Sequence, residues 1–268
     1  MTRPDWAPDD IDISIPSAAR MYDYYLGGAH NFAADRELAE KALQAVPEGR
    51  DLARANRAFL QRAVRLLAGA GIRQFLDIGS GIPTVGNVHE VAHQIAPDTR
   101  VVYVDTDPVA VSHGRALLAD DPYADAIRGD LRQPAQILAN PRLRELIDLD
   151  RPVAVLLLAV LHFISDADRP DAIIAELHEA MAPGSYLVVS HGTDDGRSTE
   201  ELEHVYRRTG TPLAMRHRAE VQALFAGFEL LEPGVVWAPQ WHPDDPSTVG
   251  EHPERSGSYV AVGRLSAS

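Results

Sequence analysis

The chain has 268 residues, of which 45% are hydrophobic and 24% are charged, as in an ordinary globular protein. Its 25 basic and 39 acidic side chains give a net charge of −14, which argues against a nucleic-acid partner because such proteins display a basic face. It has no cysteine, which excludes disulfides, thiol catalysis and cysteine-based zinc sites.

No targeting or membrane segment stands out. The longest apolar run, 153–161, is too short to span a membrane, which takes about 20 residues. The acidic, proline-rich stretch 1–12 lacks the basic and apolar regions of a signal peptide. We therefore expect a cytoplasmic protein without a membrane partner. The sequence does not indicate the oligomeric state.

The N-terminal part predicts an arm followed by helices. Residues 1–16 contain three prolines and no clear periodicity. The segment 17–32 holds three tyrosines within four positions and then a glycine pair, which suits equally a short glycine-capped helix and a lid over a ligand. Helices are expected at 35–46 and at 51–68, the second with an apolar stripe.

From residue 74 onward, strands and helices alternate. The expected strands lie at 74–78, 101–105, within 123–130, at 153–160 and at 185–190, and the helices near 85–96, 108–119, 135–147 and 168–182. Helices between buried strands imply right-handed crossovers and a parallel sheet. The pattern therefore predicts a doubly wound α/β fold.

The chain is expected to end in two helices and an antiparallel hairpin. The helices are placed at about 199–209 and 216–226, and the hairpin strands at 228–237 and 258–265, joined by a loop at 238–257. We expect an N-terminal arm and helical cap over 1–70 and a Rossmann-like core over 71–268, together in one compact unit.

The stretch 75–84, Phe-Leu-Asp-Ile-Gly-Ser-Gly-Ile-Pro-Thr, predicts a nucleotide-binding turn between a strand and a helix. Gly79 and Gly81 allow the backbone to approach a ligand closely. The third glycine of a dinucleotide fingerprint would fall at Thr84, and Asp77 would repel a pyrophosphate. S-adenosylmethionine (SAM) has cationic groups and no phosphate, so this turn favours SAM over NAD.

Carboxylates follow the next two strands. Asp105 lies 24 residues past the second glycine, where such a fold binds ribose hydroxyls. Asp107 directly precedes a proline and fits a helix N-cap better. Asp130 can accept a hydrogen bond from an adenine amino group while Leu131 packs on the ring, although a surface turn explains this pair equally well.

Several polar and aromatic residues are candidates for the acceptor side. His162 follows a buried strand and can act as a general base or make a rim hydrogen bond to cofactor or substrate; the sequence leaves both roles open. His191 and Asn31 are further polar candidates. Three aromatic residues are expected either to form a hydrophobic wall or to attract a sulfonium through their π faces: Tyr22, Tyr25 and Trp241.

One motif points to a different chemistry. The run 89–93 matches His-Glu-x-x-His, which on a helix can bind zinc with the glutamate as general base. No further ligand motif follows it, and Pro97 ends the helix early. Because the same helix follows the glycine turn, we expect no metal site.

Together these motifs resemble the Rossmann-like, class I SAM-dependent methyltransferases. The segments 19–32 (ARMYDYYLGGAHNF), 77–84 with 87–90, and 184–191 resemble, more narrowly, an uncharacterised actinobacterial family of S-adenosyl methyltransferases long described as a domain of unknown function. The similarity runs from about residue 10 to the end of the chain.

The resemblance implies a seven-stranded, mostly parallel sheet with an antiparallel last strand. It implies SAM as methyl donor, S-adenosylhomocysteine as product, and an N-terminal block that closes over the methionine end. By position, the cofactor contacts carried over from the family are Gly79, Gly81, Asp105, Asp130, Leu131 and Ala159, and the lid residues are Arg20, Tyr22 and Tyr25.

The leading hypothesis is a SAM-dependent methyltransferase that acts on a small or medium-sized molecule. The alternative is a SAM-binding sensor or partner protein without transferase activity, and NAD-dependent redox chemistry is disfavoured by the glycine turn. The sequence does not identify the acceptor or the atom that is methylated.

Overall fold

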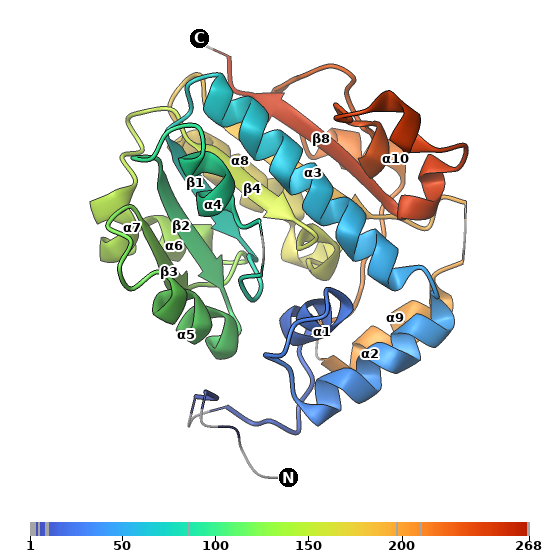
Figure 1. The fold of residues 1–268 in the computed structure, drawn as a ribbon. Helices are drawn as coiled ribbons and strands as arrows, with labels where there is room; N and C mark the ends of the chain where they lie inside the picture. The colour runs from blue at the N-terminus through green and yellow to red at the C-terminus, as the bar shows by residue number, and fades with distance from the viewer. Residues whose placement is uncertain are drawn as a thin grey trace.

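The structure, a computed structural model, describes residues 4, 6–8, 11–84, 86–196, 198–209 and 211–266. Its centre is an eight-stranded sheet of order β3-β2-β1-β4-β5-β8-β6, with β7 also paired to β8 (Figure 1). The strands are β1 Gln74–Ile78, β2 Arg100–Asp105, β3 Ala124–Arg128, β4 Ala154–Leu158, β5 Tyr186–Gly192, β6 Glu229–Leu230, β7 Val236–Trp237 and β8 Ser258–Arg264. Strands β1 to β5 pair in parallel and β8 is antiparallel to its neighbours, which confirms the predicted fold class.

Helices cover both faces of the sheet. They are α1 Ala18–Tyr25, α2 Ala33–Ala45, α3 Gly49–Gly69, α4 Val88–His93, α5 Pro108–Leu117, α6 Pro134–Leu138, α7 Pro141–Leu146, α8 Pro170–Ala180, α9 Glu200–Tyr206 and α10 Arg218–Ala223. Successive strand residues point to opposite faces. In β1, Phe75 packs in a cluster with Phe59 of α3, whereas Leu76 packs in a cluster with Ile174 of α8. Both faces of β1 are therefore buried, as in parallel sheets generally.

Two predicted elements are interrupted. The helix expected at 135–147 is two helices, because the side chain of Asn140 caps α7 and a proline takes its first position. The strand expected at 228–237 is two short strands, β6 and β7, with Pro233 between them; proline cannot donate to a ladder. This break accounts for eight strands where seven were expected. The connection 238–257 forms three short 3₁₀ helices.

Helices α1, α2 and α9 form a cap beside the carboxyl ends of the strands (Figure 1). Met21 of α1, Leu38 of α2 and Tyr206 of α9 share its small apolar core. Helix α3 runs from the cap onto the sheet, where it packs against the core strands. The division of the chain near residue 70 stays a prediction. Within the described ranges, we find no helix with the length and apolarity needed to cross a membrane.

Candidate functional site

A cavity of about 810 Å³ lies between the carboxyl ends of the parallel strands and the cap. This volume is within the range of small-molecule sites, about 300–1,000 Å³. Every cofactor or catalytic residue predicted from the sequence lines it: Arg20, Tyr22, Tyr25, Asp77, Gly79, Gly81, Asp105, Asp130, Leu131, Ala159 and His162. The structure thus brings these residues together, whereas their individual roles stay predictions.

The glycine turn is fastened to the end of β2. Gly79 and Gly81 have φ of 74° and 67°, a left-handed conformation that favours glycine. The N–H of Gly81 donates to Oδ2 of Asp105 at 2.7 Å, and the N–H of Asp107 donates to Oδ1 of the same carboxylate at 2.8 Å. A Cβ on Gly81 would meet no atom of the described residues within 4 Å, so this glycine leaves open space in the cavity.

Two buried carboxyl groups, Asp77 and Asp105, flank the turn. Burial raises the pKa of Asp77 to about 7, with Arg57 acting in the opposite direction and Asp105 adding to the rise. Burial also raises the pKa of Asp105 to about 6, against the backbone hydrogen bonds that it accepts from Asp107, Gly81 and Thr106. Because a nearby cation stabilises ionised carboxylates, this end of the cavity is suited to a positively charged ligand.

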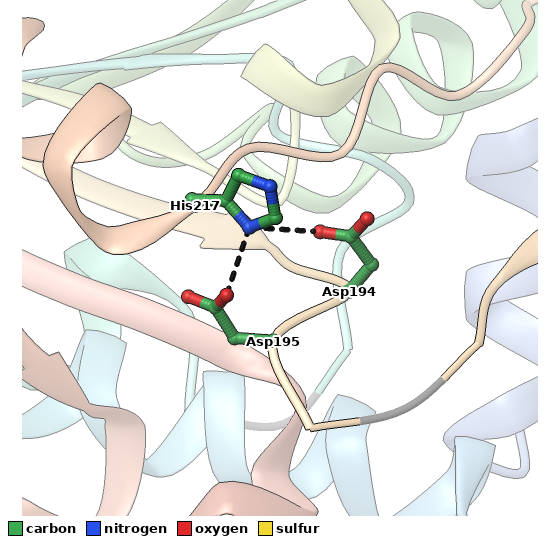
Figure 2. Close-up of side chains that lie close together, drawn as sticks. All are labelled: Asp194, Asp195 and His217. Atoms are coloured by element: carbon green, nitrogen blue, oxygen red, sulfur yellow. Dashed lines mark hydrogen bonds and ion pairs between the residues drawn. The ribbon is translucent and has the colours of Figure 1, made fainter.

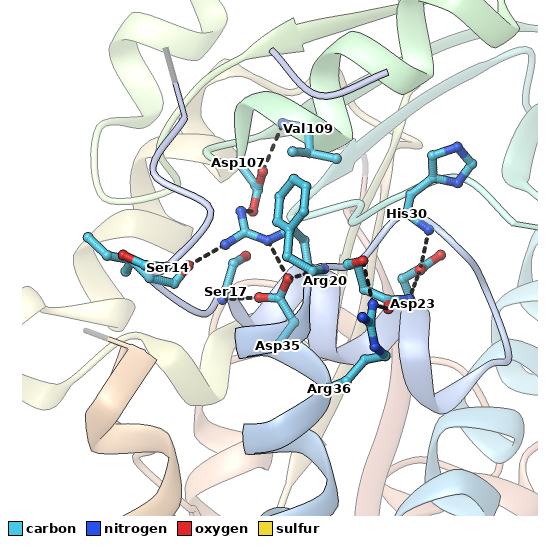
Figure 3. Close-up of polar contacts among 12 residues, drawn as sticks. Ser14, Ser17, Arg20, Asp23, His30, Asp35, Arg36, Asp107 and Val109 are labelled. Atoms are coloured by element: carbon cyan, nitrogen blue, oxygen red, sulfur yellow. Dashed lines mark hydrogen bonds and ion pairs between the residues drawn. The ribbon is translucent and has the colours of Figure 1, made fainter. Parts of the chain in front are cut away.

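Arg20 belongs to a buried ion-pair network (Figure 3). Its Nε donates to Oδ2 of Asp35 at 2.9 Å, its Nη1 donates to Oδ2 of Asp107 at 2.8 Å, and its Nη2 donates to the carbonyl of Ile15. Asp107 also accepts from the N–H of Val109, which confirms the predicted N-cap of α5. Arg20 therefore joins α1 to α2 and to the connection between β2 and α5, directly after Asp105.

A directed chain of hydrogen bonds connects the cavity floor to the cap. The N–H of Ala159 donates to Ser190 Oγ at 2.8 Å, and this hydroxyl donates to Asn56 Oδ1 at 2.6 Å. The amide of Asn56 donates to the hydroxyl of Tyr22 at 2.9 Å, which in turn donates to the carbonyl of Ala53. Ala159 is held at φ 52°, a conformation uncommon outside glycine. Sequence reasoning missed Asn56 and Ser190.

His162 is a neutral ring with a defined tautomer. Burial lowers its pKa to about 3, with His191 and Arg216 acting in the same direction. Its Nδ1 accepts the N–H of Gly192 at 3.3 Å, so the ring proton resides on Nε2. Among the described residues, Nε2 has no hydrogen-bond partner, and the ring lines the cavity. This arrangement favours the hydrogen-bonding role over that of a general base.

The structure differs from the sequence prediction for three other residues that were expected on the acceptor side. His191 is fully engaged: Nδ1 donates to the carbonyl of Gly192 and Nε2 accepts from Arg216. Asn31 donates to Asp23 and is absent from the cavity lining, so the acceptor-side role expected for it is wrong. Trp241 is also absent from the lining. It is fully buried against Phe59, with ring centroids 5.2 Å apart, and is no part of an aromatic wall.

Asp130 and Leu131 lie where β3 ends. Hydrogen bonds from Arg132 lower the pKa of Asp130, and the two side chains form an ion pair at the cavity rim. Leu131 is almost fully buried. Asp130 begins a turn, as the alternative interpretation expects, and it also lines the cavity, so the adenine contact stays a prediction.

The His-Glu-x-x-His motif has a structural explanation. Glu90 accepts the N–H groups of Gly86 and Asn87 and so caps α4. His89 bonds through Nδ1 to the hydroxyl of Tyr103 at 2.7 Å, and His93 bonds through Nε2 to the carbonyl of Thr99 at 2.8 Å. Both histidines and the glutamate are thus engaged in local structure.

A group of potential metal ligands among the described residues consists of Asp194, Asp195 and His217 (Figure 2). His217 Nδ1 lies 2.8 Å from Asp195 and 3.4 Å from Asp194, and its hydrogen bond to Asp195 raises its pKa. None of the three side chains lines the cavity. The ion pair alone accounts for this group.

Comparison with known proteins was made on sequence and on structure. The sequence model of a family described as S-adenosyl methyltransferase matches residues 4–266. The curated proteins contain no match. A candidate methyltransferase from Thermobifida fusca YX is 43% identical, with a TM-score of 0.93 over 98% of this chain and 100% of that one.

A DUF574 family protein from Streptomyces avermitilis is 40% identical, with a TM-score of 0.89 over 94% of this chain and 99% of the other. Human N-acetylserotonin methyltransferase, solved with SAM, is 14% identical with a TM-score of 0.50, over 92% of this chain and 62% of that one; this likeness concerns the fold alone. The family match identifies the cofactor as SAM rather than NAD. The chain belongs to the S-adenosyl methyltransferase family and is a SAM-dependent methyltransferase.

Proposed function

We propose that the cavity binds SAM along the ends of β1, β2 and β3 and a small-molecule methyl acceptor beneath the cap. The observation that carries this proposal is the glycine turn with its two buried carboxyl groups. Gly81 leaves open the space that a Cβ would take, and Asp77 and Asp105 offer negative charge to a ligand that is cationic and rich in hydroxyls. Bound SAM would supply a methyl group on a sulfonium, which a nucleophile displaces in line.

Each carboxyl group has a separate role in this proposal. Asp105 already accepts the N–H of Gly81 on Oδ2 and that of Asp107 on Oδ1, and a carboxylate has about four acceptor positions, so acceptor capacity remains for ribose hydroxyls. Asp77 pairs with the α-ammonium at the other side of the turn. Leu131 packs on the adenine ring beside Asp130, and Tyr22 and Ala159 delimit the methionine end.

His162 acts as a hydrogen-bond donor in the proposed site. Because Nδ1 accepts from Gly192, Nε2–H faces a ligand as a donor and orients the acceptor molecule. A pKa of about 3 leaves the ring uncharged near neutrality, so a proton released by the acceptor passes to water. Catalysis then rests mainly on alignment of the nucleophile with the methyl group.

The replacement Asp105→Ala tests the proposal. It removes the acceptor of the Gly81 N–H and the proposed ribose contact, so we expect SAM affinity to fall about 10- to 100-fold. Isothermal titration calorimetry with SAM measures this, with the exposed Asp98→Ala as the matched control. Wild-type protein that binds no SAM at millimolar concentration, or an Asp105→Ala variant that binds as wild type does, contradicts the proposal.

SAM affinity is also expected to depend on pH through Asp77. The pKa near 7 means that this carboxyl is ionised above neutrality and protonated below it, and only the ionised form attracts an ammonium. We expect the dissociation constant to rise about 20-fold from about pH 7.5 to about pH 5.5. Asp105, with its pKa near 6, adds to the loss in acid.

Titrations at several pH values check this dependence. The Asp77→Asn variant should bind weakly at every pH and keep only the smaller, more acidic step that belongs to Asp105. Affinity that is constant across this range in the wild type would show that Asp77 does not pair with the cofactor.

A further inference from the structure

The cavity has two ends that differ in charge. Every charged side chain that lines it belongs to the N-terminal arm, to α1, to Arg57 of α3, to the strands β1, β2 and β3, or to the loops after β2, β3 and β4. The lining residues contributed by 42–53 and by the described part of 199–215 carry no charge. The acceptor end, defined here by these two segments with Tyr25, His162 and Phe163, therefore has no charged side chain among the described residues of its lining. Arg216, which lowers the pKa of His162, is absent from the lining, buried, and paired with Asp166 at 2.7 Å.

Apolar and aromatic surface dominates the acceptor end. Phe163, Leu202 and Leu213 pack against the apolar core of the cap but stay partly exposed, and all three line the cavity. The rings of Phe163 and Tyr206 lie 5.7 Å apart at an interplanar angle of 36°. Flat rings favour a flat ligand, which can stack or meet them edge to face. Burial of apolar surface contributes about 25 cal/mol to the free energy of binding for each Å² removed from water.

Hydrogen-bond donors are few at this end. His162 offers Nε2–H. The hydroxyls of Tyr25 and Tyr206 lie 3.3 Å apart and share one hydrogen bond, which leaves one O–H hydrogen for a ligand. The nearby threonine hydroxyls are engaged, as Thr209 is with the carbonyl of Tyr206 at 2.7 Å. The acceptor end thus presents donors to a neutral oxygen or nitrogen and no ion to a charged group.

We infer that the methyl acceptor is an uncharged, largely apolar molecule with a planar ring and one or two hydrogen-bond acceptor atoms. A carboxylate, phosphate or ammonium on the acceptor would lose its hydration beside Phe163, Leu202 and Leu213 without gaining a counter-ion, which is costly. This inference rests on the proposed function, since it concerns the compartment that remains when SAM occupies the charged end.

Binding of three matched naphthalenes tests the inference. The protein is saturated with S-adenosylhomocysteine, which fills the cofactor end without allowing turnover. Calorimetry or ligand-observed NMR then compares the binding of 2-acetylnaphthalene, 2-naphthoate and 2-(aminomethyl)naphthalene. The three compounds share the naphthalene ring system and are neutral, anionic and cationic, respectively. We expect the neutral ketone to bind at least about tenfold more tightly than either ion.

A charge introduced at the acceptor end should reverse this preference. Leu202→Lys places an ammonium among the apolar lining, so 2-naphthoate should gain at least about tenfold over the ketone. Leu117→Lys, at an exposed leucine on α5, is the matched control and should keep the wild-type order. If Leu202→Lys does not fold, Leu213→Lys makes the same test, with S-adenosylhomocysteine binding as the check on folding.

The outcomes separate this inference from the proposed function. Failure of S-adenosylhomocysteine to bind the wild-type protein would remove the proposed function and this inference with it. If the cofactor product binds but the ketone does not, or if either ion binds as tightly as the ketone, only the inference on the acceptor is overturned. An unchanged order in a folded Leu202→Lys variant would place the acceptor elsewhere and also overturn it.

Discussion

Replacement of Arg20 by methionine is expected to lower the free energy of unfolding by about 3–5 kcal/mol, because it leaves two buried carboxylates without their cation. Asp35 and Asp107 are at most 6% exposed as side chains, so water cannot take the place of the guanidinium. Such a loss corresponds to a fall of about 6–15 °C in the midpoint of thermal unfolding. Differential scanning calorimetry and urea titration measure it.

The control for Arg20→Met is the same substitution at an exposed ion pair. Arg54 pairs with Asp51 on the surface of α3, with both side chains more than 60% exposed, so Arg54→Met should change stability by no more than about 0.5 kcal/mol. We also expect Arg20→Met to make α1 and α2 of the cap, residues 18–45, more sensitive to proteases. Equal stability of the two variants would mean that the buried network contributes nothing to the attachment of the cap.

Replacement of Gly79 by alanine is expected to abolish SAM binding and to destabilise the fold. The left-handed backbone at this position costs an alanine about 1–2 kcal/mol. Its Cβ would also lie 2.3 Å from Cγ2 of Val160, and overpacking of this kind costs about 1–3 kcal/mol more. Relief of the clash must move the turn and with it the N–H of Gly81, which Asp105 holds.

Gly81→Ala is the matched control for this prediction. Gly81 has a similar φ, but its Cβ would meet no atom of the described residues within 4 Å. We expect Gly81→Ala to retain about 1–3 kcal/mol more stability than Gly79→Ala, and yet to bind SAM poorly because the new methyl group occupies the cofactor space. Urea titration and calorimetry with SAM separate the two effects. Equal loss of stability in both variants would show that contact with Val160 is not decisive.

Local patterns in the sequence were sufficient for most of the sheet. The apolar run and glycines around β1 gave its limits to the residue, because a buried strand and a tight turn both constrain residue type. The breaks were less visible: Asn140 with a following proline is a helix start inside a helical pattern, and Pro233 divides an otherwise regular strand. Both breaks have a local signal in the sequence, but the regular hydrophobic pattern around them led to the prediction of a single continuous element in each case.

In the candidate site, too, some residues could be predicted from local sequence patterns and others could not. Asp105 and Asp130 could be placed at one edge because the carboxyl ends of parallel strands meet there. Asn56 and Ser190 could not, because their hydrogen bond joins positions 134 residues apart and nothing in the sequence around either residue indicates the other. Trp241 was misplaced because aromatic character does not say whether a ring faces a cavity or the core.

Two of the three cap helices, α1 and α2, come from the beginning of the chain, but α1 is bonded to groups that are synthesised much later. Arg20 bonds to Asp107, 87 residues further on, and Tyr25 bonds to Tyr206, 181 residues further on. Helix α1, with eight residues, is too short to hold its shape alone. As the chain leaves the ribosome, we therefore expect α1 and α2 to lack their contacts with Asp107 and α9 until most of the sheet has formed, so that closure of the cavity is a late step of folding.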